Sequence, residues 1–296
     1  MKDRELSATR SFMFAPANHP RRVEKVFQLG ADAIILDLED AVAIAEKEAT
    51  RAKVVAAFQQ ADRRSRHYVR VNSLETSYCR EDLNCTVGPW LDGVVLPKVE
   101  SPEELKQAEA WLAEAELAAG IPVGSLDLLP IIETAAGVEN AKHLATAGTR
   151  IARLAFGGGD YTLDLDYVWS ADEEVLQYAR ARLSHASRLG NLLPPIDTVV
   201  LQIADDERFI ASAERGRKYG FGGKLCIHPS QVPLANNVFT PSAEEIAHAK
   251  AVVNAFEAAE AAGSASIQLD GYFIDYPIVY KSQRILALAN LLEGSN

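Results

Sequence analysis

The sequence predicts an α/β protein, a (β/α)8 barrel followed by a C-terminal helical lid or tail extension. Two observations favour this fold. Strand-like and helix-like segments alternate about every 30 residues, and eight short apolar runs are bounded by turn or helix-start residues. Eight such units in a chain of 296 residues fit a closed barrel better than a doubly wound sheet.

The eight expected strands are separated by helix signals. The clearest of these begins at Ser101, where a serine N-cap, Pro102 at the first helical position and Glu104 complete a capping box. We therefore expect residues 1–240 to form one catalytic domain with the TIM-barrel architecture. Its strands are expected at residues 11–16, 33–40, 67–72, 93–99, 126–133, 151–156, 196–200 and 223–229.

Residues 241–296 follow the eighth strand, and a barrel does not need them in order to close. A long amphipathic helix is expected between Ser242 and Gly263. The segment after it is too apolar to be left in water by a monomer. We therefore expect this segment to pack over a barrel mouth or against a neighbouring subunit. Its apolar residues are Tyr272, Phe273, Ile274, Tyr276, Ile278 and Val279.

Composition excludes several classes of function. A formal net charge of −11 argues against a nucleic-acid surface, which needs a basic field. No run of 18 apolar residues indicates a membrane span, and the first ten residues lack the apolar core of a signal peptide. Three cysteines without a CxxC pair suggest reduced thiols. We expect a cytoplasmic protein.

The carboxyl ends of the expected strands carry mainly charged residues, and chemistry in this fold occurs at that end. Taken singly, a strand-end aspartate can instead be the N-cap of the next helix, and for Asp40 and Asp197 both interpretations stay open. Glu39, Asp40 and Lys98 are expected to support the groups that touch the substrate. The candidate site residues at the ends of the expected strands are Asp37, Glu39, Asp40, Arg70, Lys98, Glu133, Asp160, Asp197 and His228.

Glu133 and Asp160 are the strongest candidates, because each ends a buried apolar run where a carboxylate does not help packing. Two carboxylates at a barrel mouth suit a hard cation, Mg²⁺ or in its place Mn²⁺. The glycines before Asp160, which include Gly158 and Gly159, indicate close approach of a substrate to the backbone. No Walker, GxGxxG, HExxH or GxSxG motif points to other chemistry.

Positive charge is found at two places near the expected mouth. Arg70 is suited to hold a substrate carboxylate through its planar fork, or alternatively to pair internally with Glu39 or Asp40. The first strand-to-helix connection is also basic and is a candidate site for a phosphate-bearing ligand. Alternatively, these basic residues form a helix face that is exposed to solvent and binds no ligand. The candidate residues for binding the phosphate-bearing ligand are Arg10, Asn18, Arg21 and Arg22.

Eight segments together resemble the citrate lyase β-subunit family, which includes malyl-CoA and citramalyl-CoA lyases within the 2-keto-acid aldolases. They occur in the family's order between Arg10 and about Leu288. One departure is Ala15 and Ala17, where the family's opening motif has valine and glycine. The segments are RSFMFAPANHPRR, ADAIILDLEDAVAIAEKEATR, VRVN, GVVLPKVES, LLPIIETAAGVENA, LAFGGGDYTLDL, GKLCIHPSQV and GYFIDYPIVYKSQRIL.

The resemblance implies a Mg²⁺-dependent homo-oligomer, a trimer or a hexamer, that cleaves a 3-hydroxy-3-carboxylic acyl-CoA thioester into acetyl-CoA and a 2-keto acid. Glu133 and Asp160 match the family's metal ligands, and Arg70 matches the arginine that holds the keto acid. The resemblance also implies that the phosphate-bearing ligand expected at Arg10, Asn18, Arg21 and Arg22 is coenzyme A. Asp275 matches an aspartate that a neighbouring subunit's tail delivers to the acetyl carbon, where it acts as acid in cleavage and base in condensation.

Three functions stay open at this point. The protein is a free-standing acyl-CoA lyase, a β-subunit of multi-subunit citrate lyase that acts on citryl-acyl-carrier protein, or a malyl-CoA-type thioesterase. The side chain of the substrate also stays open: it is hydrogen in malyl, methyl in citramalyl and carboxymethyl in citryl thioesters. A methylene changes affinity by only ~1–3 kcal/mol, and the pocket positions that would discriminate are not readable from the sequence.

Overall fold

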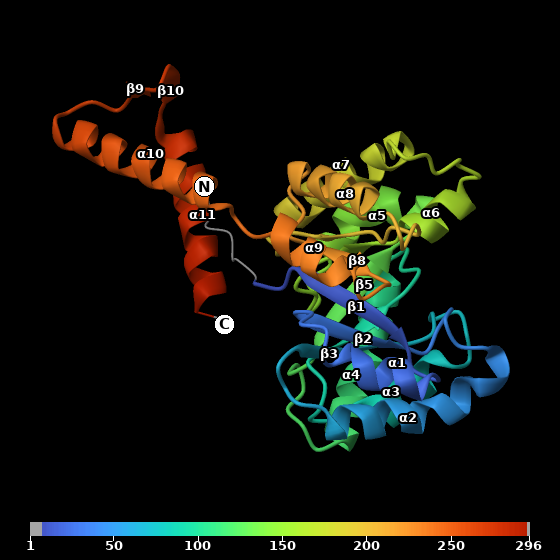
Figure 1. The fold of residues 1–296 in the computed structure, drawn as a ribbon. Coiled ribbons are helices and arrows are strands. Elements are labelled where there is room, and N and C mark those ends of the chain that lie inside the picture. The colour runs from blue at the N-terminus through green and yellow to red at the C-terminus, as the bar shows by residue number, and fades with distance from the viewer. Residues whose placement is uncertain (1–7, 295–296) are drawn as a thin grey trace.

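The computed structural model describes residues 8–294, and in it eight parallel strands close into a barrel (Figure 1). β1 pairs with β2 on one side and with β8 on the other, which completes the closure. The predicted barrel with eight strands is therefore confirmed. The strands are β1 Ser11–Pro16, β2 Ala33–Asp37, β3 Arg66–Arg70, β4 Gly93–Leu96, β5 Asp127–Ile132, β6 Ala155–Phe156, β7 Ile196–Asp197 and β8 Gly223–Cys226.

Helices surround the barrel and connect its strands (Figure 1). At α4, Ser101 and Glu104 form the predicted capping box. Within residues 8–294, no helix combines the length and the apolar character needed to cross a membrane. The helices are α1 Pro20–Val26, α2 Lys47–Gln60, α3 Cys79–Thr86, α4 Pro102–Ala118, α5 Ala135–Ala145, α6 Gly158–Asp164, α7 Gln177–Leu189, α8 Asp206–Lys218 and α9 Gln231–Val238, with 3-10 turns at Ile44–Glu46 and Glu174–Leu176.

Two hydrophobic cores follow from the alternation of side chains along each strand. In β1, Phe12 belongs to the core inside the barrel, whereas Met13 belongs to the core between strands and helices. The inner core fills the barrel, so that a ligand can enter only at its ends. The inner core contains Phe12, Ala33, Ile35, Tyr68, Val95, Leu129, Ile131, Ala155, Ile196 and Leu225.

The C-terminal tail consists of helix α10 (Ala243–Ala261), a hairpin of β9 (Ile267–Leu269) and β10 (Tyr272–Ile274), and helix α11 (Tyr276–Glu293). It has a small core of its own, made of Val252, Phe256, Ile274 and Val279. Ile274 and Val279, which the sequence assigned to a docking surface, are therefore already buried within the tail. The outermost residues of the two predicted domains, 1–7 and 295–296, lie outside the described residues.

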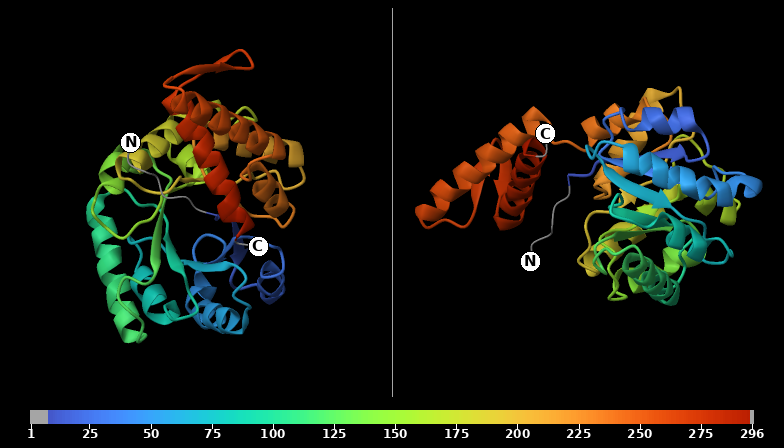
Figure 2. Two further views of the ribbon diagram at one scale, coloured as in Figure 1. Left: turned by 90° about the vertical axis from the view of Figure 1, so that its left-hand side faces the viewer. Right: turned by 90° about the horizontal axis from the view of Figure 1, so that it is seen from below.

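The tail projects away from the barrel, as Figures 1 and 2 show. Leu291 of α11 borders a cavity that is also lined by Asp32, Asp92 and Asp127, and each of these aspartates lies just before or at the start of a strand. The tail thus leaves from the amino-terminal end of the barrel. It does not cover the mouth of its own barrel.

Candidate active site

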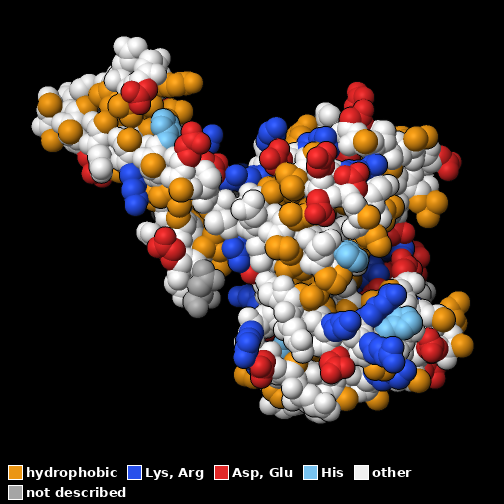
Figure 3. Space-filling model, viewed as in Figure 1, with side chains coloured by type: hydrophobic (Ala, Val, Ile, Leu, Met, Phe, Trp, Pro, Cys, Tyr) orange, Lys and Arg blue, Asp and Glu red, His pale blue; other side chains and the backbone are white. Residues whose placement is uncertain are grey.

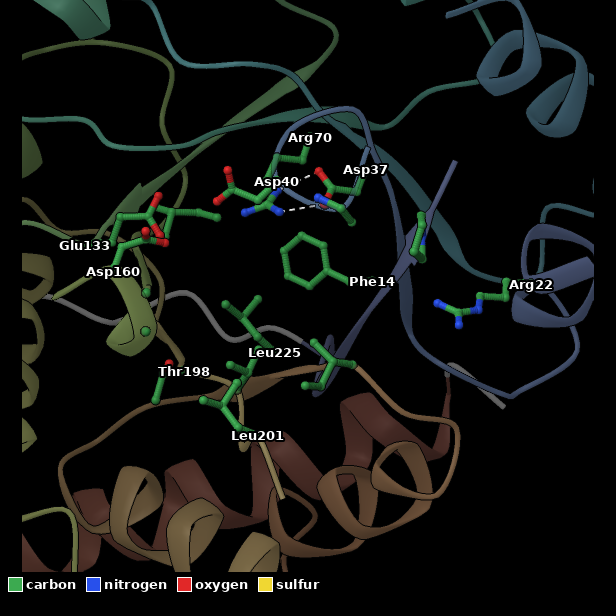
Figure 4. Close-up of a pocket in the computed structure, with 17 residues that line it drawn as sticks. Phe14, Arg22, Asp37, Asp40, Arg70, Glu133, Asp160, Thr198, Leu201 and Leu225 are labelled. Atoms are coloured by element: carbon green, nitrogen blue, oxygen red, sulfur yellow. Dashed lines mark hydrogen bonds and ion pairs between the residues drawn. The ribbon is translucent and has the colours of Figure 1, made fainter. Parts of the chain in front are cut away.

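A pocket of about 460 Å³ opens at the carboxyl ends of the strands. Two of its carboxylates, Glu133 and Asp160, lie together on one side, and Phe14, Leu201 and Leu225 contribute an apolar wall (Figure 4). Seven of the eight strands or the segments that directly follow them contribute lining residues. These are Phe14, Pro16, Asp37, Asp40, Ala41, Arg70, Ile131, Glu133, Gly157, Gly159, Asp160, Thr198, Val199, Leu201, Leu225 and Ile227, together with Arg22 of α1.

Glu133 directly follows β5 and is 3% exposed. Its Oε1 accepts a hydrogen bond from the backbone nitrogen of Lys98 at 2.9 Å. Lys98 has a left-handed φ of 54°, a strained conformation that is commonly found at functional sites. The pKa of Glu133 is raised to about 8, mainly by burial and in addition by the negative charges of Asp160 and Glu39, against the opposing effect of Arg70 and Lys98.

Three glycines before Asp160 have different surroundings. A Cβ at Gly157 would lie 2.2 Å from Oε2 of Glu133, so this carboxylate requires a glycine there. Gly158 donates its N–H to Oγ1 of Thr198 at 2.7 Å, which removes it as a donor to a substrate. Gly159 lines the pocket. The sequence indicated close backbone approach at all three glycines and assigned only Gly158 and Gly159 to substrate binding, whereas the need for glycine at Gly157 depends on the position of Glu133.

The carboxylates fit a hard divalent cation. Glu133 and Asp160 provide the oxygen ligands that Mg²⁺ prefers. The described residues hold no group of three or more His, Cys, Asp or Glu that could bind a metal alone, so water and substrate oxygens would complete its coordination. The mutual repulsion that raises the pKa of Glu133 would be relieved by a cation between it and Asp160.

Arg70, at the end of β3, is held by carboxylates on two of its sides. Its Nε and Nη2 donate to Asp37 at 2.7 and 2.6 Å, and Nη1 lies 2.8 Å from Oε2 of Glu39. The internal pairing foreseen with Glu39 is present, whereas Asp37 takes the place expected for Asp40. Each terminal nitrogen carries a second hydrogen, so a substrate carboxylate can still be bound. The guanidinium stacks 4.9 Å above the ring of Phe14.

The charge pairs around Arg70 shift the ionisation of their members. Burial opposes ionisation of Asp37, but Arg70 outweighs it and holds the pKa of Asp37 below its usual value. Burial also raises the pKa of Glu39, although Arg70 and Lys98 oppose the shift. Lys98 Nζ lies 2.5 Å from Glu39, 3.3 Å from Asp40 and 4.0 Å from Asp160. Lys98 therefore links Glu39, one of the two carboxylates that hold Arg70, to Asp160.

The residues expected to bind coenzyme A do not form one cluster. Arg21 and Arg22 are exposed on α1, and Arg22 borders the pocket. Asn18 lies in the same connection and donates to Glu46 at 2.6 Å. Arg10 precedes β1, pairs with Asp32 at 2.8 Å and donates to Thr240 at 2.9 Å. A strand of six residues is about 20 Å long, which separates Arg10 from the mouth.

Other strand-end residues have structural roles or lie elsewhere. Asp197 is fully buried and pairs with Arg180 and Lys224, so it is neither a helix cap nor a pocket residue. His228 lies 2.9 Å from the hydroxyl of Ser230. Asp275 does not line the pocket: it is the N-cap residue of α11 in the tail, which projects away from the barrel (Figure 1). Thr134 caps α5, because its Oγ1 accepts a hydrogen bond from the backbone N–H of Gly137 at 3.0 Å.

Residues 10–229 match the model of the HpcH/HpaI aldolase/citrate lyase family. The chain belongs to this family. It is 37% identical over 282 residues to the citrate lyase subunit beta of Leuconostoc mesenteroides subsp. cremoris, a match that spans 95% of this chain and 93% of the relative. It is 34% identical over 285 residues to a (3S)-malyl-CoA thioesterase of Cereibacter sphaeroides, with 96% and 95% covered. Membership of this family suggests lyase activity.

Solved structures agree with the family and the fold. CitE from Mycobacterium tuberculosis, in complex with magnesium, acetoacetate and coenzyme A, superimposes with a TM-score of 0.80 at 27% identity, covering 96% of this chain and 99% of that one. A citrate lyase from Burkholderia xenovorans has a TM-score of 0.85 at 19% identity, covering 97% and 93%, and supports the fold alone.

Proposed function

We propose that this protein is a Mg²⁺-dependent carbon–carbon lyase that cleaves a 3-hydroxy-3-carboxylic acyl-CoA thioester into acetyl-CoA and a 2-keto acid. The observation that carries the proposal is the presence of Glu133, Asp160 and Arg70 in one pocket. Two carboxylates suit a metal, and an arginine fork suits the carboxylate of an α-hydroxy acid. CitE, whose structure contains magnesium and coenzyme A, supports the same ligands here.

Each of these residues has a separate role in bond cleavage. Glu133 and Asp160 would hold Mg²⁺, which when bound supplies Lewis-acid polarisation of the hydroxyl and keto oxygens. Arg70 would hold the carboxylate that becomes part of the keto acid. As the bond between C2 and C3 breaks, the 3-hydroxyl gives up its proton and its oxygen becomes the keto oxygen of the 2-keto acid. The electron pair of the broken bond is left on the thioester α-carbon, and a proton must reach that carbon to give acetyl-CoA. The apolar wall of Phe14, Leu201 and Leu225 would limit access of water to this carbon in a bound substrate.

We assign the proton donor to Asp275 of another subunit in a homo-oligomer, a trimer or a hexamer. The tail that carries Asp275 lies at the amino-terminal end of its own barrel, so it does not reach its own pocket. Asp275 is the N-cap residue of α11, yet its side chain makes no capping hydrogen bond. A carboxylate unused by its own helix is available for chemistry in a partner's pocket.

Coenzyme A would enter past α1, where Arg21 and Arg22 provide positive charge for its phosphates. Figure 3 shows Lys and Arg side chains gathered on the face that includes α1. The three cysteines of the chain, Cys79, Cys85 and Cys226, are free, which supports a reducing, cytoplasmic location.

Two related functions are supported by the names of relatives. A citrate lyase subunit beta at 37% identity favours action on a citryl thioester of an acyl-carrier protein. A (3S)-malyl-CoA thioesterase at 34% identity favours hydrolysis, in which water attacks the thioester carbonyl instead. All three functions use the same pocket and the same two carboxylates.

Product analysis distinguishes the three. Purified protein and Mg²⁺ would be incubated separately with citramalyl-, malyl- and citryl-CoA. A lyase releases acetyl-CoA and a 2-keto acid in equal amounts, whereas a thioesterase releases free coenzyme A and a hydroxy acid. Citryl-acyl-carrier protein as a fourth substrate tests the subunit function. Free coenzyme A as the main product from every CoA ester would overturn the lyase proposal in favour of hydrolysis.

A further inference from the structure

Helix α6 carries Asp160 as its third residue, so the placement of this short helix decides where the carboxylate lies. The N-cap residue, Gly157, has no side chain with which to cap the helix. Instead, Oγ1 of Thr198 accepts a hydrogen bond from the buried N–H of Gly158 at 2.7 Å. A residue 40 positions later in the chain thus replaces the missing cap.

The contact between Thr198 and the start of α6 is close. A Cβ at Gly158 would lie 2.9 Å from Oγ1 and 3.2 Å from Cγ2 of Thr198. The helix start therefore rests on both branches of this side chain, and only a glycine allows this approach. In Figure 4, Thr198 lies beside the first turn of the helix that bears Asp160.

The other end of α6 is tied to the segment that follows Glu133. Oδ2 of Asp164, the last residue of α6, accepts a hydrogen bond from the backbone nitrogen of Ala135 at 2.8 Å. Ala135 stands two residues after Glu133. The helix is thus anchored at its start to the segment after β7 and at its end to the segment after β5. These two anchors set Asp160 relative to Glu133.

Thr198 is itself held in place by its neighbour in the chain. Asp197 is fully buried and accepts hydrogen bonds from Arg180 at 2.8 and 3.0 Å and from Lys224 at 2.7 Å. A Cβ at Gly216 of α8 would lie only 2.7 Å from Oδ2 of Asp197, so this helix packs directly on the ion pairs. Consecutive residues of an extended segment point to opposite sides, so Asp197 anchors the outer side while Thr198 faces the pocket.

We propose that Thr198 is a positioning residue that fixes Asp160 relative to Glu133 and thereby sets the affinity of the pocket for Mg²⁺. The proposal rests on the assignment of these two carboxylates as metal ligands. Without the hydroxyl, the N–H of Gly158 is left buried without an acceptor, which favours a shift of the helix. Serine keeps the acceptor, whereas valine keeps only the shape.

The test compares Thr198→Val and Thr198→Ser by calorimetric titration with Mg²⁺ alone and by hydrogen exchange of residues 158–164. Thr198→Val should weaken Mg²⁺ binding about tenfold, as loss of a group that orients a ligand typically does, and should speed exchange. Thr198→Ser should stay within about threefold of wild type, since serine caps at least as well as threonine. The matched control, Thr86→Val in α3, loses an equally buried hydroxyl outside the pocket and should change neither quantity.

Each other outcome has a definite meaning. A folded Thr198→Val protein with wild-type Mg²⁺ affinity would overturn the positioning role, and so would failure of serine to restore the affinity. If wild type binds no Mg²⁺, the proposed function fails. Exchange of α6 then still decides whether Thr198 holds this helix, and unchanged exchange in the valine variant would reject that role as well.

Discussion

Asp37 and Arg70 are register partners on the neighbouring strands β2 and β3, and two hydrogen bonds join their side chains, at 2.7 and 2.6 Å. Strand pairing therefore fixes the plane of the guanidinium before any ligand binds. One edge of Arg70 faces Asp37, and hydrogens on its terminal nitrogens remain for a ligand in the pocket. This arrangement is preorganised for a planar carboxylate.

The first prediction concerns this preorganised fork. Arg70→Lys keeps the charge but loses the planar donor pair, so the KM for the keto acid in the condensation direction should rise about tenfold or more. The KM for acetyl-CoA should change little. Asp37→Asn should reproduce part of the effect and should also destabilise the fold by about 3 kcal/mol, because it leaves a buried cation with one carboxylate fewer. Equal effects on both substrates would show that Arg70 does not hold the keto acid.

The second prediction concerns the two carboxylates. Glu133→Gln and Asp160→Asn remove charge with little change of shape, so each should weaken Mg²⁺ binding by at least about 100-fold and abolish turnover. Calorimetry with Mg²⁺ and circular dichroism would measure binding and fold. Glu103→Gln, at an exposed position on α4, is the matched control and should behave as wild type. Wild-type turnover in excess chelator would refute the metal dependence.

The third prediction concerns the basic residues of α1. Replacing Arg21 and Arg22 with alanine should raise the KM for the CoA ester about tenfold, since two exposed ion pairs are each worth up to ~1 kcal/mol. The effect should shrink as salt is added, and kcat should be preserved. Arg64→Ala removes an exposed arginine at the other end of the barrel and serves as the control. An unchanged KM would place the phosphates elsewhere.

The fourth prediction is a pH dependence of stability that arises from His67. This side chain is fully buried and stacks on Phe58 with ring centroids 4.7 Å apart. Burial, together with the charge of Arg63, lowers the pKa of His67 below the ordinary histidine value of 6.5. Below pH 6.5 the unfolded chain therefore binds a proton that the folded protein excludes, so stability falls as the pH drops towards the lowered pKa.

Urea unfolding between pH 7.5 and 5 tests this dependence. His67→Leu cannot be protonated, so the variant should lose less stability than wild type over this interval, although it is less stable than wild type at pH 7.5. The same change at the exposed His143 should leave the wild-type slope in place. Parallel slopes for wild type and His67→Leu would exclude His67 as the source.

Much of the fold could be predicted from the sequence because each strand is a short apolar run with clear boundaries. The starts of β1, β2, β4, β7 and β8 match the expected residues, whereas β6 contains only its last two residues. The 151–154 segment is apolar at Ile151 and Leu154, but does not pair as a regular strand. Apolar character predicts burial, and pairing depends in addition on the neighbouring strands.

A residue of the site could be predicted from the sequence only where its position at the end of a strand decides where its side chain points. Glu133 and Asp160 fall in this class. Thr198 was hidden inside an expected strand at 196–200, and its role depends on the helix start that lies opposite it. Arg10 was grouped with the basic residues of α1 because they are close in the chain, although β1 separates them. Contacts between distant segments were not visible in local patterns.

The last prediction is that the active site is shared between subunits. The tail exposes large apolar side chains, with Tyr272 at 70% and Phe273 at 67% exposure. The rim of the barrel mouth also exposes large apolar side chains, with Leu163 at 73% and Leu201 at 56% exposure. These two apolar surfaces lie at opposite ends of the barrel, so they cannot cover each other within one chain. They can be buried only when the tail of one subunit packs on the mouth of another.

Asp275→Ala should therefore lower lyase activity by about 10²–10⁴-fold, the usual contribution of a positioned acid, with little loss of Mg²⁺ or CoA binding. The helix should persist, because the side chain of Asp275 makes no capping bond. Mixing this variant with Glu133→Gln after reversible dissociation should restore part of the activity, since some mixed sites then receive both intact groups. Mixtures that stay inactive despite proven subunit exchange would place Asp275 in the site of its own subunit or outside catalysis.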